Sequence, residues 1–404
     1  IRLTIELVTP AFVGGADQQA EFRPASLKNV WRWWWRALRP SLDDGATAEE
    51  GELFGTGGSG SRQGALSLRL ARYTPLREWG VHQFPNLSQP LGYLGYGPIQ
   101  YNRDRRAILN ERACLQPGQQ VELVATLRSG ITNEQLLGLL KAAKVMCLVG
   151  GVGGRSRRGW GSLRLAAVDG NDIARCDGEG RYARRVLDLI SKAAASLPGE
   201  HTCFSRDMWA LAREVRGDWR EAMGRAGAAM IEARQNLSGR NPKMRRVHWG
   251  AYKADHDLMD RFLNAATEAN RARRNTADLS DAPKRLALSG LPHNYFFSSP
   301  GKTTPKADFE VITEEGGVLD RRSSPLFLHV EPLEPDANGE RSLVVFTYLP
   351  SAHLFPAGST LKAYARPNEG QWSITGSTAA PSGFEGSIPL KESLVSQGWK
   401  ALPV

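Results

Sequence analysis

Hydrophobic and polar residues alternate in four separate stretches near the start of the chain, and two longer stretches between them repeat with the period of a helix. Alternation at every second residue is typical of a strand with one buried face, whereas apolar residues three and four positions apart are typical of an amphipathic helix. Thr132 is predicted to cap the second helix. The predicted strands are 1–8, 64–73, 120–128 and 161–168, and the predicted helices are 26–38 and 131–149. The order strand, helix, strand, strand, helix, strand is that of a ferredoxin-like (RRM-like) fold, an antiparallel sheet with two helices on one face.

The first predicted helix has a wide apolar face and a basic face. Ser26 is predicted to cap its N-terminus, and Trp31, Trp34 and Trp35 are predicted to lie in the core. Trp33 lies among arginines on the polar face, where an aromatic ring suits stacking on a nucleic-acid base. The alternative is that Trp33 packs under an inserted segment or against a partner subunit.

The two middle strands are separated by residues 74–119, which are too many for a hairpin turn and rich in Gly, Pro and Tyr. We interpret this segment as an insertion, either a long loop or an extra hairpin.

The remainder of the chain predicts a second, different mixture of elements. Stretches rich in Ala, Arg and Glu predict helices, and later apolar stretches predict strands. The predicted helices are 181–236 and 252–275, and the strand candidates are 285–298, 322–331 and 341–349. We therefore expect an α+β protein with tandem ferredoxin-like domains. Residues 1–172 form the first domain, and 173–404 form a degenerate second one that carries a helical block at about 181–285.

The charge of the chain changes this picture from a fold to a class of partner. The 404 residues include 52 Lys and Arg against 42 Asp and Glu, a formal net charge of +10. Residues 1–175 carry +7, residues 181–290 carry +8, and residues 291–404 carry −3. A basic field of this kind attracts polyanions, among which RNA and DNA are the commonest soluble ones. The alternative is a solvated surface with an ordinary excess of Lys and Arg.

Composition excludes several other classes of protein. Hydrophobic residues make up 41% of the chain, which excludes a disordered protein. The four cysteines lie far apart without CxxC or CxxH spacing, which argues against a disulfide framework or a structural zinc site and fits a reducing cytoplasm. No apolar stretch approaches the roughly 18 residues that span a bilayer, and no signal peptide is recognisable, so we expect no membrane partner.

The sharpest motif is GGVGGRSRRGWG at residues 150–161, between the second predicted helix and the fourth predicted strand. Its glycines permit positive φ angles and close approach of the backbone to a ligand, and successive N–H groups can form an anion-binding nest. The three arginines add charge-assisted phosphate contacts, and we expect them to project into solvent because the loop is mostly glycine. A P-loop is excluded because GK[ST] is missing and a helix precedes the motif. The alternative is a flexible connector, but RSRR favours binding to a nucleic-acid backbone.

A weaker echo of this motif, with glycines at 316–317 and a pair of arginines after them, precedes a later strand candidate. From the two motifs and the basic face of the first helix we predict an RNA-binding site. Its predicted residues are Arg23, Lys28, Arg32, Trp33, Arg36, Gly153, Gly154, Arg155, Ser156, Arg157, Arg158, Arg321 and Arg322.

No constellation of residues predicts catalysis. The seven histidines are scattered, and none lies in the first 81 residues. Asp255, His256 and Asp257 would point to different faces of a helix, so we expect a solvated helix start rather than a metal site. Asp43 and Asp44 are expected in a turn or helix cap rather than in phosphodiester cleavage. We therefore predict no catalytic residues, no metal and no cofactor.

Four pieces of the sequence resemble the RAMP superfamily of CRISPR-associated proteins, and more specifically the first-numbered subunit of the type III-B effector, the Cmr complex. They are TPAFVGGADQ (9–18), RPASLKNVWRWWWRAL (23–38), GGVGGRSRRGWGS (150–162), and the pair GLPHNYFFSS (290–299) with RRSSPLFL (321–328). Asn29 departs from the family pattern, which usually has glycine after the lysine of the helix.

The resemblance implies tandem ferredoxin-like folds in a non-catalytic subunit. Such a subunit helps to capture target RNA near the 3′ region of the guide RNA in antiviral defence. Its implied partners are guide RNA, target single-stranded RNA or both, and other Cmr subunits of the superfamily. One alternative is a standalone guide-RNA-processing endoribonuclease of the same superfamily, for which Tyr73 is the only early general acid or base. The other is a purely structural subunit that touches no RNA.

Overall fold

The computed structural model describes two compact units, which are treated separately below. The first comprises residues 1–228, 327–349 and 398–404, and the second comprises 229–326 and 350–397. Residues outside the description are 16, 18, 72–75, 85–86, 103–104, 238–264, 267, 278–292, 297–305, 320–322, 354, 357, 367–373, 380–386 and 404.

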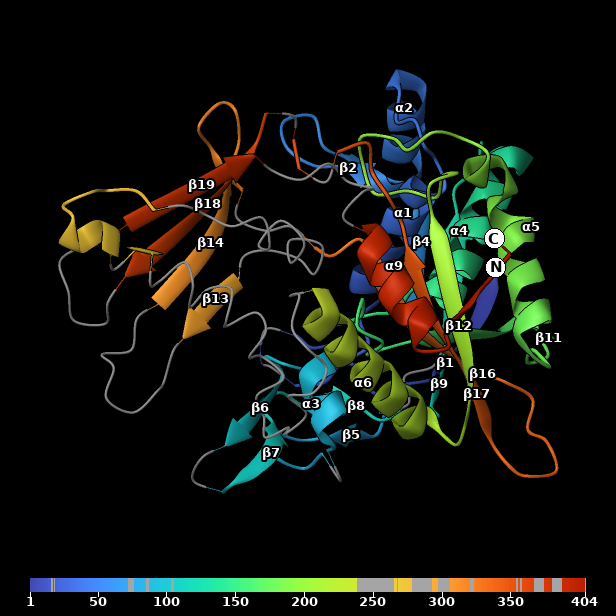
Figure 1. Cartoon of the computed structure of the whole chain (residues 1–404). Coiled ribbons are helices and arrows are strands. Elements are labelled where there is room, and N and C mark those ends of the chain that lie inside the picture. Colours follow the sequence, from blue (N-terminus) through green and yellow to red (C-terminus); the bar gives the residue numbers. More distant parts are fainter. Residues whose placement is uncertain are drawn as a thin grey trace. The chain divides into compact units, whose positions relative to one another are not determined.

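The first unit begins with an antiparallel sheet of the predicted order (Figure 1). Its strands are β1 (Arg2–Leu7), β4 (Leu66–Leu70), β9 (Gln120–Leu127), β10 (Leu163–Val168) and β11 (Asn171–Asp172), arranged as β11-β10-β1-β9-β4. In β1 the residues Leu3, Ile5 and Leu7 are fully buried while their neighbours are not, so the alternation in the sequence marks the inner face. The four long strands therefore confirm the predicted segments.

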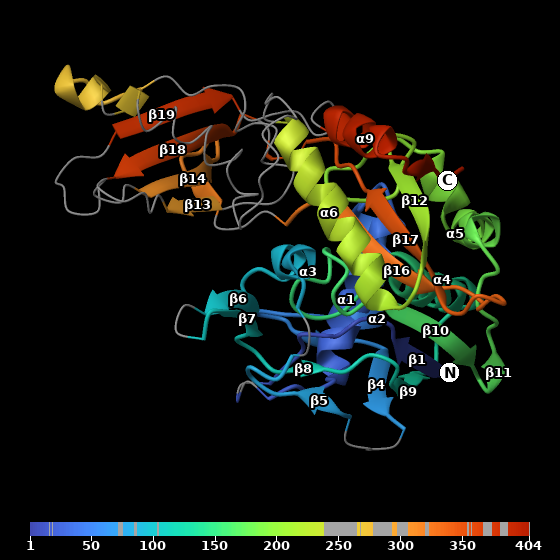
Figure 2. The same cartoon turned by 60° about the horizontal axis from the view of Figure 1, so that its bottom comes forward.

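Helices α1 (Pro24–Ala37) and α4 (Asn133–Val149) pack against each other on one face of this sheet (Figure 2). Thr132 caps α4 as predicted, in a reciprocal capping box with Gln135. The predicted Ser26 cap of α1 is wrong. The helix begins at Pro24, whose fixed φ suits the first helical position, and Arg23 precedes it without a side-chain cap. The shorter helix α2 (Asp44–Phe54) follows and was not predicted.

A second antiparallel sheet belongs mainly to the first unit. It contains β12 (Trp209–Arg216), β16 (Leu326–Pro332), β17 (Arg341–Tyr348) and β20 (Lys400–Ala401), in the order β16-β17-β12-β20. Helices α5 (Glu179–Ala194), α6 (Trp219–Leu237) and α9 (Ser387–Ser396) accompany these strands along the chain. A continuous core of buried side chains from both sheets, α1, α4 and α5 includes Trp31, Trp34, Trp35, Phe327 and Val345.

The predicted helix over 181–236 is therefore wrong in its middle. The stretch WALAREVR, rich in helix-forming Ala, Arg and Glu, is the central strand β12, paired with β17 from Trp209–Tyr348 to Arg216–Arg341. Pairing on both edges and burial of its first four residues outweigh the local preference for helix. Of the predicted helix at 252–275, the described residues include helical turns at 265–266 and 268–271.

The second unit contains a third antiparallel sheet, β13 (His293–Phe296), β14 (Lys306–Ile312), β18 (Thr360–Arg366) and β19 (Ile374–Ala379), with β15 (Val318–Leu319) paired to β14. The glycine pair 316–317, seen as an echo of the first motif, forms the turn between β14 and β15: the Gly316 N–H donates to the carbonyl oxygen of Thr313. The turn accounts for these glycines, as Gly316 has a φ of 84°.

The insertion 74–119 contains the extra hairpin that was one of its two predicted forms. Strands β6 (Ile99–Asn102) and β7 (Ala107–Asn110) pair with each other after a short helix, α3 (Gln89–Leu94). Strands β5 (Glu78–Trp79) and β8 (Cys114–Leu115) form a second small ribbon, and β2 (Gly55–Thr56) and β3 (Arg62–Gln63) form one outside the insertion. The buried Asn110 side chain holds the insertion together, since its amide donates to the carbonyls of Gly80 and Arg112.

Candidate nucleic-acid interface

The segment Gly150–Gly161, here called the glycine–arginine loop, is fixed by backbone hydrogen bonds. The N–H of Gly161 donates to Pro10, that of Gly154 to Phe12, and that of Val152 to Gly161, at 2.8–2.9 Å. A Cβ on Gly161, whose φ is 66°, would lie 2.1 Å from the carbonyl oxygen of Val152. The glycines are needed because the backbone approaches other backbone. The predicted anion nest is therefore wrong for these three N–H groups, which are already donated within the chain.

The three arginines of the loop have different surroundings. Arg155 is exposed and has a φ of 61°, a left-handed conformation that is uncommon for a residue with a Cβ. The Arg157 guanidinium lies over two rings, 4.6 Å from the centroid of Phe327 and 5.0 Å from that of Trp33. The Arg158 guanidinium lies 5.7 Å from the ring centroid of Tyr93. The expectation that all three project into solvent is wrong for Arg157 and Arg158, which are half-buried.

Behind the loop lies strand β16 of the second sheet. The Leu328 N–H donates to the carbonyl of Arg157 at 3.1 Å, and buried His329 Nδ1 donates to the carbonyl of Gly150 at 2.9 Å. On the other side, buried Thr9 donates through Oγ1 to the carbonyl of Gly159 at 2.6 Å. The loop thus joins the two sheets. Sequence reasoning missed Thr9 and His329 because a single hydroxyl or imidazole carries no local signal of such a contact.

The basic face of α1 is largely engaged in the fold. Arg32 and Arg36 both form ion pairs with the buried carboxylate of Glu50 on α2, the second at 2.7 Å. Lys28 Nζ donates to the carbonyl of Leu66 at 2.6 Å. Burial, followed by the nearby Arg32 guanidinium, lowers the pKa of the Lys28 ammonium. These three predicted RNA contacts have partners within the protein.

Trp33 has the packing role that was left open, with a different partner. Its ring meets Trp34 edge-on at 4.8 Å and Phe327 of β16 at 5.3 Å between centroids. Trp33 is half-buried, whereas Trp31, Trp34 and Trp35 are core residues as predicted. The ring therefore packs on a strand of the same chain, neither under the insertion nor exposed for stacking.

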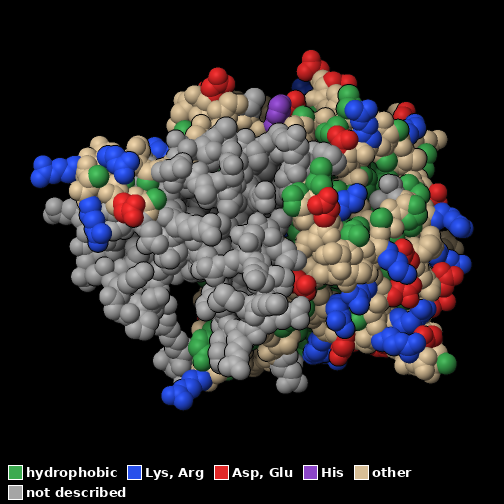
Figure 3. Space-filling view, viewed as in Figure 1, with side chains coloured by type: hydrophobic (Ala, Val, Ile, Leu, Met, Phe, Trp, Pro, Cys, Tyr) green, Lys and Arg blue, Asp and Glu red, His purple; other side chains and the backbone are tan. Residues whose placement is uncertain are grey.

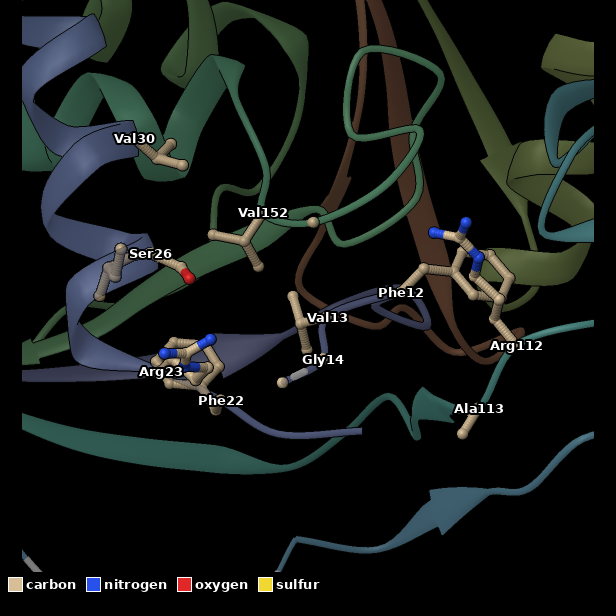
Figure 4. A pocket seen from close by; sticks show the side chains of 13 residues that line it. Phe12, Val13, Gly14, Phe22, Arg23, Ser26, Val30, Arg112, Ala113 and Val152 are labelled. Atoms are coloured by element: carbon tan, nitrogen blue, oxygen red, sulfur yellow. The ribbon is translucent and has the colours of Figure 1, made fainter. Parts of the chain in front are cut away.

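Three of the motifs chosen from the sequence meet at one pocket of about 280 Å³ (Figure 4). The strand-exit loop contributes Phe12 to Gly15, the start of α1 contributes Phe22 to Val30, and the glycine–arginine loop contributes Val152 and Gly153. Exposed Arg23 and Arg112 lie on opposite sides of the pocket in Figure 4. Sequence reasoning missed Arg112, which lies inside the insertion. On the face shown in Figure 3, basic and acidic side chains are interspersed, so charge alone does not locate a site there.

Other candidate residues contribute no further described site. Asp43 caps α2, accepting a hydrogen bond from the Ala46 N–H at 2.8 Å, which confirms its predicted cap role. The candidates Tyr73, 255–257, Arg321 and Arg322 lie outside the described residues. Within the described ranges there is no group of three His, Cys, Asp or Glu side chains placed to hold a metal ion. None of the described helices is both long and apolar enough to cross a bilayer.

The comparison with protein families agrees with this geometry. The family model of the RAMP superfamily matches residues 4–164, the span that holds the first sheet and the three pocket motifs. This part of the chain is a RAMP-superfamily domain, which confirms the resemblance found in the motifs.

Individual relatives narrow the resemblance to one subunit. The chain is 27% identical over 172 residues to the CRISPR system Cmr subunit Cmr1-2 of Pyrococcus furiosus, covering 40% of this chain and 92% of that protein. It is also similar to the crystal structure of Cmr1 from Pyrococcus furiosus in its apo form, at 13% identity and a TM-score of 0.48, covering 100% of this chain and 96% of that one. A chain of the type III-B Cmr-beta complex bound to cognate target RNA, AMPPnP and ssDNA is similar at 11% identity and a TM-score of 0.48, with 98% of each chain covered.

Proposed function

We propose that this protein is a non-catalytic, RNA-binding subunit of a type III-B CRISPR-Cas (Cmr) ribonucleoprotein in the cytoplasm. It contributes to target RNA capture near the 3′ region of the guide RNA in antiviral defence. Its partners are guide RNA, target single-stranded RNA or both, and other Cmr subunits of the RAMP superfamily. The printed identity of its Pyrococcus furiosus relative as a Cmr subunit supports this assignment.

We also propose that the chain is a tandem of ferredoxin-like domains with a boundary near residue 172. The first sheet is built in the chain order β1, α1, β4, β9, α4, β10. The second has the chain order β12, α6, β16, β17, α9, β20, and its strand order β16-β17-β12-β20 is the first one read in reverse. The same strand–helix order and the same sheet order support a second domain of the same kind.

The observation that carries RNA binding is the meeting of the three motifs at one pocket between arginines. Phe12, Phe22 and Val152 give it an apolar lining that suits a nucleobase. The exposed Arg23 and Arg112 suit the flanking phosphates, because a guanidinium binds phosphate oxygens in pairs.

The glycine–arginine loop extends the same surface. Of its residues, we propose Gly153, Gly154, Arg155, Ser156 and Arg158 as RNA contacts. Arg155 is the one among its arginines that is more exposed than half-buried. Arg157 is not proposed as a primary contact, since it is held against Phe327 and a tryptophan of α1.

The test is equilibrium binding of the full chain to labelled single-stranded RNA over a series of salt concentrations. Replacing Arg23, Arg112 and Arg155 with alanine is expected to weaken binding at least tenfold. The slope of log K against log salt should fall by about two, at about 0.7 per phosphate contact. A matched control replaces three exposed arginines that do not line the pocket: Arg181, Arg184 and Arg216.

Each other outcome contradicts a stated part of the proposal. Failure of the unaltered protein to bind RNA would support a purely structural subunit. Site-specific RNA cleavage by the pure protein, with or without divalent metal, would support the endoribonuclease alternative. Equal losses in the pocket and control variants would show that binding depends on total charge and not on this site.

A further inference from the structure

The hairpin of β6 and β7 presents two exposed aromatic rings. Tyr96, just before β6, is 56% exposed, and Tyr101 within β6 is 46% exposed. By contrast Ile99, two residues before Tyr101 and on the same face of the strand, is buried. A two-stranded ribbon has no third strand to cover its far end. The fold of the hairpin therefore does not account for the aromatic side chain of Tyr101.

Positive charge surrounds these rings. Arg105 and Arg106 are exposed between β6 and β7, and Arg106 has a φ of 48°. The Asn102 side chain shapes the turn by accepting from the Arg105 N–H at 2.9 Å. The segment 96–112 contains four arginines against two acids, of which Glu111 is described and exposed. Exposed aromatic rings among arginines are the composition of a surface that binds single-stranded nucleic acid.

The hairpin adjoins the glycine–arginine loop. The space beside the α-carbon of Gly97, where a Cβ would lie, is 2.9 Å from Nη2 of Arg155. The same measure at Gly154 lies 3.9 Å from Pro98. An RNA strand that contacts Arg155 is therefore already beside the segment that carries Tyr96.

We propose that the β6–β7 hairpin is a second RNA-binding element, on which Tyr96 and Tyr101 stack bases and Arg105 and Arg106 contact phosphates. This inference rests on the proposed RNA-binding function and extends its site beyond the pocket. Stacking accepts any base because every base has a π-face, so the hairpin adds affinity without sequence preference.

The experiment measures binding of the full chain to an oligouridylate and an oligoadenylate of about 20 nucleotides, each over a salt series. Replacing Tyr96 and Tyr101 together with alanine is expected to weaken binding to both at least tenfold and to leave the salt slope unchanged. Replacing both with phenylalanine keeps the rings and should keep binding within about twofold. Replacing Arg105 and Arg106 with alanine should lower the salt slope by about 1.4.

The matched control replaces Leu137 and Leu197, which are 58% and 60% exposed, with alanine, and should leave RNA binding unchanged. Normal binding by the tyrosine-to-alanine variant, together with loss in the Arg23, Arg112 and Arg155 variant, would overturn this inference and leave the proposed function standing. Equal loss in the alanine and phenylalanine variants would also overturn it, because the hydroxyl groups and not the rings would carry the contact. A parent that binds no RNA would overturn both proposals. Normal RNA binding with loss of assembly in the alanine variant would assign the hairpin to a protein partner instead.

Discussion

Replacing Arg157 with alanine is expected to lower the melting temperature of the protein, although the residue lies in a glycine-rich loop. Its guanidinium is 4.6 Å from the ring centroid of Phe327 and 5.0 Å from that of Trp33, both within the roughly 6 Å range of a cation–π interaction. Such a contact is worth about 0.5–1 kcal/mol at the surface and about 2 kcal/mol when desolvated. Because Arg157 is half-buried between these limits, the two contacts together amount to about 1–3 kcal/mol.

Thermal unfolding followed by circular dichroism or intrinsic fluorescence measures this loss. At about 2–4 °C per kcal/mol for a unit of this size, the expected decrease is about 2–12 °C. Arg157→Lys keeps the charge but not the planar group and should fall between the two proteins. Arg155→Ala, in the same loop, should change stability by no more than about 0.5 kcal/mol. An Arg157→Ala protein that melts with the parent, or an Arg155→Ala protein that melts equally early, would refute the assignment of Arg157 to the fold.

Three further outcomes are expected. Gly161→Ala should cost about 2 kcal/mol or more, seen as a lower melting temperature or loss of soluble protein, because its Cβ meets a carbonyl oxygen at 2.1 Å; Gly154→Ala, with 3.5 Å of space, should be tolerated, and equal effects would contradict this. Glu50→Gln should cost about 1–2 kcal/mol in thermal unfolding, a discounted value because its two arginine partners are a third to a half exposed, and an unchanged melting temperature would show that the ion pairs contribute nothing. Burial raises the pKa of Cys114 to about 12 and of Cys176 to about 11, so both thiols should resist iodoacetamide at pH 8 until the protein is denatured. These thiols ionise more readily when unfolded, so the stability they contribute is present below about pH 8.5 and is lost as the pH rises towards 11–12; fast labelling of the native protein would contradict their burial.

The order of elements in the first sheet could be predicted because it is written in local patterns. Alternation in β1 and β9 marks their buried faces directly, and Thr132 with Gln135 supplies both halves of a capping box. The tryptophan pattern of α1 likewise identified its three core residues. Each of these signals extends over fewer than twenty residues and needs no knowledge of distant parts of the chain.

Strand β12 and the surroundings of Arg157 could not be predicted in this way. The composition of β12 favours a helix, and its strand pairing comes from β17, more than a hundred residues later. Phe327, the nearer ring under Arg157, is likewise far along the chain. A glycine-rich context indicated solvent for the arginines because it reports only on neighbours in sequence. The same limit applies to Arg32, whose partner Glu50 lies on a helix that was not predicted.

The conformation of Arg155 separates the demands of folding from those of binding within the one loop. At Gly153 and Gly161 the φ angles are 83° and 66°, and a Cβ would strike backbone atoms at 2.5 and 2.1 Å, so the fold itself requires glycine there. At Arg155 the φ angle is similarly positive, 61°, and a left-handed residue with a Cβ costs about 1–2 kcal/mol. Folding alone would favour glycine at this position as well. An exposed arginine held there at such a cost, beside both the pocket loop and the β6–β7 hairpin, is better explained by what its guanidinium binds than by what it stabilises.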